Sequence, residues 1–424
     1  MTSGLQSTRG ALALRFIETR ERTEMLAAPL SAEDQMLQSM DDCSPTRWHR
    51  AHTTWFFETF LLLPRGVPAY CAAWAPLFNS YYEQVGPRHP RARRGVLSRP
   101  SVSEVAEYRR VVEERVLSLL EHATESELVK ISSILTLGFA HEEQHQELLM
   151  TDILHAFSEN PLKPAYQPQT LARMPLASSA PELLTYIPVE GGLVDVGAAA
   201  EEGRFVFDNE TPVHRVWLEP FALSNRLVTV AEVRGFVRDG GYRRASLWLS
   251  EGFAWTQANA VDSPIYMRVE GDDCLVFDLS GERVPCDAEP AVHLNYYEAD
   301  AIARFLGARL PTEFELEHAG RAAPVAGGFL SDFLCPNIAS GSGLQQLWGE
   351  AWAWTRSSYE AYPGFATSED ALGEYNGKFM VNQRVLRGGS YLTPPGHVRR
   401  TYRNFWPAHT RFQASGVRLA RGYP

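Results

Sequence analysis

Apolar residues recur at three- and four-residue spacing through residues 10–160, where turn-forming residues are few. This periodicity is typical of amphipathic helices with one face turned toward a core. It predicts four helices, one before Met40 and the others over residues 44–63, 102–122 and 124–157. We therefore expect residues 1–160 to form a four-helix bundle.

Two of these helices have recognisable start signals. Ser44 followed by Pro45 fits an N-cap with proline at the first helical position. Thr124 with Glu127 three residues later has the pattern of a capping box. Both signals place the helix starts directly before apolar periodic segments.

The pattern changes beyond residue 157. Residues 158–182 contain five prolines and little periodicity, so we expect a linker over 161–185. Over 186–424 glycine and tryptophan become frequent, strands are expected to be short, and clear helices are limited to about 296–306 and 314–320. The predicted fold class is α+β, with a helical bundle followed by a domain of little regular structure.

Composition and charge exclude several function classes. The formal net charge of −11 over 424 residues argues against non-specific binding to nucleic acid. No apolar run approaches the roughly 20 residues of a membrane helix, and the N-terminus has no signal-peptide core. The five cysteines are widely spaced, without a CxxC pair, which favours a reducing, cytoplasmic location.

Residues 141–145 read His-Glu-Glu-Gln-His and are the strongest chemical signal. Two histidines four residues apart lie on one face of a helix, the spacing of metal ligands. The pattern matches the H-E-x-x-H signature of zinc peptidases. However, the position six residues after the second histidine is Thr151, and after Glu159 the next acid is Glu182. We therefore expect the third ligand to come from another segment.

His52 is the best candidate for that ligand. It shares one stripe of the 44–63 helix with Trp48, Trp55 and Thr59, and in a bundle such a stripe faces inward. His49, one turn away, is a competing choice, and hydrogen-bonded core histidines without a metal are the plainer alternative. Imidazole ligands suit iron and zinc alike, so the pattern does not choose between them.

Several longer motifs together resemble one known family. They are RWHRAHTTWFFETF (47–60), HEEQH (141–145), ARLPTEFELEHA (308–319), LWGEAWAWTRSSY (347–359), RVLRGGSY (384–391) and YRNFWPAHTRFQASGVRLAR (402–421). In this order they resemble the ergothioneine-biosynthesis sulfoxide synthases, the EgtB family. The resemblance covers nearly the whole chain and implies a DinB-like bundle followed by a lectin-like domain with the fold of formylglycine-generating enzymes. The paired catalytic cysteines of the latter enzymes are missing here.

The resemblance also implies a metal and a reaction. It marks His52, His141 and His145 as ligands of ferrous iron, and leaves His49 outside the pattern as a structural residue. The family uses O₂ to join a thiol to hercynine, the trimethylated betaine of histidine, through a carbon–sulfur bond, and the sulfur becomes a sulfoxide. A metal holding both reactants would supply effective concentration.

Other residues match positions that the family uses for catalysis and for the thiol. Tyr81 and Tyr82 match paired tyrosines of the branch that uses free cysteine, where a phenol can donate a proton or hydrogen atom. Arg91 and Arg94 match two arginines that hold the thiol substrate's carboxylate. The catalytic tyrosine of the γ-glutamylcysteine branch falls near Leu372. The resemblance therefore implies L-cysteine as donor.

The hercynine site is implied in the same way. Gln144 and Tyr375 would hydrogen-bond the imidazole, and Asn404, Phe405 and Trp406 would hold the betaine end. Aromatic faces recognise a trimethylammonium group through cation–π attraction. Without the resemblance, packed aromatic residues and a solvated basic loop would be the simpler interpretations.

Alternative functions remain at this stage. Within the family, the donor could be γ-glutamylcysteine or the seleno-sugar of a selenoneine-forming relative. From other classes, the bundle could belong to a zinc-dependent thiol transferase, or the second domain could be a binding module. The expected partners are hercynine, cysteine and O₂, without nucleic acid or membrane.

Overall fold

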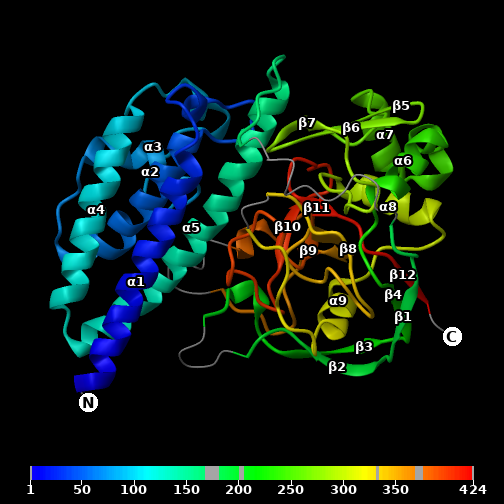
Figure 1. Cartoon of the computed structure of the whole chain (residues 1–424). Coiled ribbons are helices and arrows are strands. Elements are labelled where there is room, and N and C mark those ends of the chain that lie inside the picture. Colours follow the sequence, from blue (N-terminus) through cyan, green and yellow to red (C-terminus); the bar gives the residue numbers. More distant parts are fainter. Residues whose placement is uncertain (1, 168–180, 200–204, 331–333, 368–375, 423–424) are drawn as a thin grey trace. The chain divides into compact units, whose positions relative to one another are not determined.

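The computed structural model describes residues 2–167, 181–199, 205–330, 334–367 and 376–422 (Figure 1). The described residues up to Asn160 form one compact unit, and those from Pro161 onward form a second. Among the described helices, none is both long enough and apolar enough to cross a membrane.

The first unit is helical, as its periodicity predicts. Its α-helices are α1 (Thr2–Ala27), α2 (Thr46–Phe57), α3 (Ala75–Phe78), α4 (Val102–His122) and α5 (Glu125–Glu159). The four long helices pack side by side, with α1 and α2 against α5 and α2 also against α4 (Figure 1). The predicted four-helix bundle is confirmed.

The helix starts follow their sequence signals with one exception. Thr124 donates its backbone N–H and its hydroxyl to the Glu127 carboxylate, at 2.8 and 2.6 Å, so the predicted capping box forms. By contrast, Pro45 rather than Ser44 is the cap of α2. The Ser44 backbone N–H instead donates to Asp152 Oδ2 at 2.8 Å, because a partner on α5 lies within reach.

The second predicted helix also changes geometry before its expected end at residue 63. After Phe57 the chain continues as a π-helical turn, Glu58–Leu62, and then a 3₁₀ turn, Leu63–Arg65. Gly66 ends this segment with φ 78°, a left-handed conformation that favours glycine. Such π turns are frequent at functional sites.

Gly138 lets α2 approach α5 closely. A Cβ atom at this position would lie 2.3 Å from a ring carbon of Phe57, so only glycine fits. The contact lies one turn before His141 on α5. It therefore brings the two helices together next to the histidine pentad.

The second unit combines short strands with long loops. Its helices are α6 (Val230–Arg238), α7 (Ser250–Ala258), α8 (Tyr296–Phe305) and α9 (Glu313–Ala319). Its strands are β1 (Tyr186–Val189), β2 (Gly192–Val196), β3 (His214–Leu218), β4 (Phe221–Ser224), β5 (Met267–Glu270), β6 (Asp273–Asp278), β7 (Gly281–Arg283), β8 (Trp352–Ser358), β9 (Gln383–Arg387), β10 (Asn404–Pro407), β11 (Ser415–Gly416) and β12 (Ala420–Gly422). The α+β class is confirmed.

Within the described part of the unit the strands form four small sheets, with orders β1-β4-β12, β10-β9-β8-β11, β2-β3 and β5-β6-β7. All pairs are antiparallel except β8 with β11. Strand β12, near the end of the chain, pairs with β4 near the start of the unit (Figure 1). A core that includes Val196, Leu223, Ala353 and Ala420 joins these distant segments.

Candidate metal centre

Three histidines converge in the first unit. His52 comes from α2, and His141 and His145 come from successive turns of α5. One ring nitrogen from each lies within 4.8 Å of the others, and among the described residues no carboxylate or thiolate joins the group. The structure thus brings together the three residues predicted as ligands.

The distance between two of these rings fits a common metal ion. His52 Nε2 lies 3.1 Å from His141 Nε2. Two nitrogens bound at right angles to one ion, each at about 2.1 Å, would lie about 3.0 Å apart. The donor set of three imidazoles suits iron(II) as well as zinc.

Hydrogen bonds orient two of the rings. His52 Nδ1 lies 2.5 Å from the Phe78 carbonyl oxygen, which can only accept, so Nδ1 carries the proton and Nε2 is left with its lone pair. His145 Nδ1 lies 2.8 Å from His49 Nδ1. In both histidines the Nε2 atom is therefore the one available to a metal ion.

The surroundings keep the histidines neutral. Burial lowers the pKa of His141 to about 3. Burial also lowers the pKa of His52 and His145, and repulsion between neighbouring histidines adds to the effect. Neutral imidazole is the form that binds metal ions, so few protons need to be displaced at neutral pH.

Aromatic rings enclose the centre on the side of α2. Trp48 stacks on His52 at a centroid distance of 4.5 Å, and Phe56 lies 4.5 Å from His141. Trp55 stacks on His52 at 5.6 Å and contacts Tyr82 at 5.8 Å. These rings reduce the access of water to the histidines.

The predicted tyrosine pair borders this aromatic wall. Tyr82 is buried against Trp55 and Phe60, and half-buried Tyr81 stacks on Tyr82 at 4.6 Å. Trp55 thus separates Tyr82 from His52 by one ring.

The two predicted arginines have different environments. Arg94 is buried, lies 3.4 Å from the centroid of the Trp48 ring, and donates to Ser44 Oγ at 2.9 Å and Ser80 Oγ at 3.1 Å. Arg91 is exposed, and its guanidinium donates to the Asp42 carbonyl oxygen. Only Arg94 therefore contacts the ring that stacks on His52.

Arg94 is a buried cation without an anionic partner among the described residues. Its only recorded hydrogen-bond acceptors are the two serine hydroxyls, and its Nε has no acceptor. Burial, together with repulsion by Arg91 and against attraction by Asp152, lowers the pKa of Arg94 to about 8. A buried charge of this kind gains most from an anionic ligand.

The remaining predicted residues fall in other places. Gln144 is half-buried on α5, directly before His145. Asn404, Phe405 and Trp406 form most of β10 in the second unit, where Phe405 stacks on Tyr359 at 4.0 Å. Tyr375 lies outside the described residues.

Sequence reasoning missed two groups of buried polar residues beside the pentad. Asp152 accepts a hydrogen bond from His49. Its spacing of seven residues from His145 was a signal of a shared helix face. Glu142 binds Arg20 and Arg109. No local sequence pattern predicts this second group, because its members come from three different helices.

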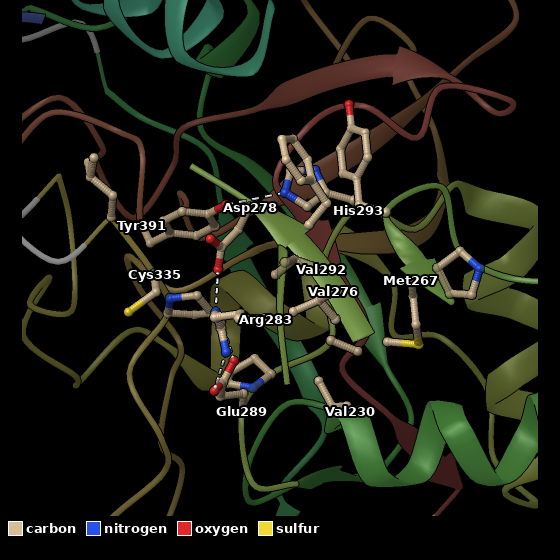
Figure 2. Close-up of a pocket in the computed structure, with 17 residues that line it drawn as sticks. Val230, Met267, Val276, Asp278, Arg283, Glu289, Val292, His293, Cys335 and Tyr391 are labelled. Atoms are coloured by element: carbon tan, nitrogen blue, oxygen red, sulfur yellow. Dashed lines mark hydrogen bonds and ion pairs between the residues drawn. The ribbon is translucent and has the colours of Figure 1, made fainter. Parts of the chain in front are cut away.

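A cavity in the second unit is a weaker candidate site. Figure 2 shows Arg283 paired with Asp278 at 2.6 Å and with Glu289 at 2.8 Å, and His293 Nε2 at 3.2 Å from the Tyr391 hydroxyl. Its charged groups therefore satisfy one another. The cavity volume of about 40 Å³ matches a few water molecules, which is too little for an amino-acid substrate.

Comparisons with known proteins agree with the motifs. Residues 15–149 match the DinB superfamily, and residues 173–333 and 335–423 match the sulfatase-modifying factor enzyme 1-like domain. Both domain types were predicted from the sequence motifs and are confirmed.

Three relatives are also similar, two of them over most of both chains. The hercynine oxygenase of Mycolicibacterium smegmatis is 31% identical over 97% of this chain and 99% of its own length. That of Mycobacterium tuberculosis is 30% identical over 89% of this chain and 91% of its own. Ergothioneine biosynthesis protein 1 of Schizosaccharomyces pombe is 24% identical over 58% of this chain and 32% of its own length.

Proposed function

Because this chain belongs to the hercynine oxygenase family of oxidoreductases, we propose that it joins hercynine to the thiol of L-cysteine in an iron(II)- and O₂-dependent reaction. The product is hercynylcysteine sulfoxide, an intermediate of ergothioneine biosynthesis. One imidazole C–H and one S–H are lost, a C–S bond forms, one oxygen atom enters the sulfoxide, and the other leaves as water.

The observation that carries the proposal is the convergence of His52, His141 and His145. Three neutral nitrogens would hold one iron(II) ion and leave half of an octahedron open. When bound, this ion supplies O₂ activation and a lowered thiol pKa. The protein's own part is to present three lone pairs within an aromatic enclosure.

Arg94 is proposed to select the thiol substrate. Its guanidinium lies against Trp48, which stacks on His52, and it lacks an anionic partner among the described residues. The α-carboxylate of cysteine would supply that partner through charge-assisted hydrogen bonds. Arg91, which is exposed, would contribute mainly long-range attraction to the same anion.

Tyr81 and Tyr82 are the proposed proton or hydrogen donors. Tyr82 is linked to His52 through Trp55, and Tyr81 stacks on Tyr82 from a half-buried position. Half-burial lets Tyr81 exchange protons with water, whereas Tyr82 is only 1% exposed. We therefore assign Tyr81 as the first candidate donor and Tyr82 as the second.

For hercynine we propose the residues that the family pattern marks, taken for each unit by itself. Gln144, between the two histidines of α5, would hydrogen-bond the imidazole. Asn404, Phe405 and Trp406 would bind the betaine end, where aromatic rings suit a trimethylammonium group. Tyr375 is retained from the family pattern as a second partner of the imidazole.

The decisive experiment is anaerobic loading with iron(II), followed by hercynine, O₂ and one thiol at a time, with the product identified by mass. We expect hercynylcysteine sulfoxide with L-cysteine. A dominant γ-glutamyl or selenium product would move the chain to another branch of the family. Activity with zinc and no O₂ consumption would instead support the thiol-transferase alternative.

A further inference from the structure

A series of hydrogen-bonded side chains leads from buried Asp152 through buried His49 to the proposed ligand His145, which is half-buried. Asp152 Oδ2 lies 3.0 Å from His49 Nε2, and His49 Nδ1 lies 2.8 Å from His145 Nδ1. The same carboxylate oxygen accepts the Ser44 backbone N–H at 2.8 Å. His49 is 2% exposed and Asp152 is 5% exposed, so water does not compete strongly for these contacts.

The Asp152 carboxylate at one end of this hydrogen-bonded series determines which ring nitrogen of His49 and of His145 carries the proton. An ionised carboxylate can only accept, so His49 carries its proton on Nε2 and donates it to Asp152. The other nitrogen of neutral His49, Nδ1, is then an acceptor. It must receive the proton of His145 Nδ1, which leaves His145 Nε2 as a bare lone pair.

We propose that His49 and Asp152 are positioning residues that hold His145 in its Nδ1–H tautomer, with Nε2 directed to the metal ion. This inference rests on the proposed metal function of the three histidines. For His52 the Phe78 carbonyl oxygen has the same effect directly, at 2.5 Å. His145 has no such carbonyl in its recorded contacts and uses a second histidine and a carboxylate instead.

Partners of this kind orient a ligand and increase its basicity, and their loss typically lowers metal affinity by about 10–100-fold. His49→Leu removes the acceptor while keeping an apolar side chain of moderate size, and we expect that loss of affinity. His49→Gln is the matched rescue variant. Its amide oxygen can accept from His145 Nδ1 and its NH₂ group can donate to Asp152.

Affinity is measured by anaerobic titration of each apo protein with cobalt(II), read from its visible absorption and checked by competition with a chelator. We expect His49→Leu to bind about 10–100-fold more weakly, and His49→Gln to recover most of the difference. Thermal unfolding of the apo proteins is recorded in parallel. A purely structural role would lower apo stability without the Gln rescue of affinity.

A direct measurement concerns the tautomer itself. In histidine-labelled apo protein, ¹⁵N–¹H correlations should show His145 protonated at Nδ1 in the wild type and a mixture of tautomers in His49→Leu. Equal cobalt affinity of wild type and His49→Leu, or a wild-type His145 protonated at Nε2, would overturn the inference. A wild type that binds no metal at all would overturn the proposed function as well, and so separates the two failures.

Discussion

Adjacent residues of α5 lead to two buried polar clusters with opposite properties. His141 and His145 converge with His52 of α2, and their nitrogens meet one another without an anion among the described residues. Glu142, one position along, is 0% exposed and belongs to a cluster of charges that match one another. Neighbouring positions on α5 point about 100° apart around the helix axis. One direction leads to the candidate metal site and the other to a cluster whose charges are paired within the protein.

The Glu142 cluster is satisfied within the chain. Glu142 Oε2 accepts from Arg20 at 2.9 Å, and Oε1 accepts from Thr23 at 2.7 Å and from Arg109 at 3.1 Å. Gln146, one turn later, donates to the Thr19 carbonyl oxygen at 2.8 Å. These contacts join α5 to α1 and α4 and lower the pKa of Glu142 against the cost of burial.

The comparison distinguishes buried polar groups that stabilise the fold, around Glu142, from groups proposed to bind a ligand, around the three histidines. In the Glu142 cluster, Arg20 and Arg109 share Glu142 and also pair with the more exposed Glu113 and Glu24, so removing Glu142 takes away the one fully buried counter-charge. On the histidine side, nitrogens of three imidazoles converge without a carboxylate among the described residues, and the Arg94 guanidinium donates to two serine hydroxyls and forms no ion pair there. Substitutions there should change binding and chemistry more than stability.

The largest expected effect is the loss of a histidine ligand. Replacing His52, His141 or His145 by alanine should lower iron(II) affinity by more than the ~10–100-fold typical of a supporting residue, and should remove most activity. Bound iron per chain after anaerobic dialysis measures this. His49→Ala is the comparison variant and should lose only the ~10–100-fold in affinity that is typical of a residue supporting a ligand. If His49→Ala lost its iron while His52→Ala kept it, the first ligand would be misassigned.

The next largest effect is on the rate of the reaction and not on metal binding or stability. Tyr81→Phe keeps the ring and removes the hydroxyl, so sulfoxide formation should fall by about 10²–10⁴-fold, the usual contribution of a general acid. Cysteine sulfinate should increase as a side product, while stability and iron content stay unchanged. Product masses from Tyr81→Phe and Tyr82→Phe provide the measurement. Wild-type product ratios in both variants would exclude this role for the pair.

Loss of Glu142 should have the opposite effect, because it should lower the stability of the protein and leave the chemistry of the reaction unaffected. Glu142→Gln removes the fully buried counter-charge of Arg20 and Arg109 and leaves them the more exposed Glu113 and Glu24, so the cost should stay below the about 3–5 kcal/mol of a fully broken buried pair. Urea unfolding of the apo protein would show a lower midpoint. Glu114→Gln, which removes an exposed partner of Arg110, is the matched control and should leave the midpoint unchanged. Equal midpoints for both variants would contradict the distinction between the clusters.

Substitution of Arg94 tests whether a positive charge near the three histidines binds the carboxylate of the thiol substrate. Arg94→Met keeps an unbranched side chain against Trp48 but removes the cation, so KM for cysteine should rise by the equivalent of about 2–5 kcal/mol. KM for hercynine should change far less. Stability of the free enzyme should not fall, because the lost charge had no anionic partner. Arg91→Met, at an exposed position, should give a smaller rise in KM.

The last expected effect is a difference between the two clusters in how they make the stability of the apo protein depend on pH. Buried His52 and His141 and half-buried His145 have pKa values below their ordinary value of 6.5, so below that pH the unfolded chain binds more protons than the folded chain. Apo stability should therefore fall as pH drops from about 6.5, by up to about 1.4 kcal/mol per unit for each such histidine. Glu142, whose pKa is lowered, adds its loss only below about 4.5.

Urea unfolding of the apo protein between pH 7 and pH 5 measures this slope. A His141→Phe variant should show a shallower slope, because it lacks one of the neutral histidines. Glu142→Gln should shift the whole curve downward with little change of slope in this range. An unchanged slope in His141→Phe would show that this histidine is not held neutral in the folded protein.

The sequence by itself determined the helices, the capping box at Thr124, the shared face of His141 and His145, and the two domain types. These features depend on spacings of three, four or seven residues along one helix, or on contiguous motifs. Their physical basis is local, since backbone hydrogen bonds and the helical period operate within a few residues. His52, which the sequence analysis preferred over His49, lies in the convergent group with His141 and His145, and its role as a metal ligand stays a prediction.

Only the tertiary structure decided the partners across helices. His49 contacts His145 from 96 residues away, and Arg20 contacts Glu142 from 122 residues away. The structure also separated Arg94, buried on Trp48, from exposed Arg91, although both belong to the same basic loop. Such contacts depend on how the helices rotate and pack, and the amphipathic period specifies which face is buried without specifying which side chain it meets.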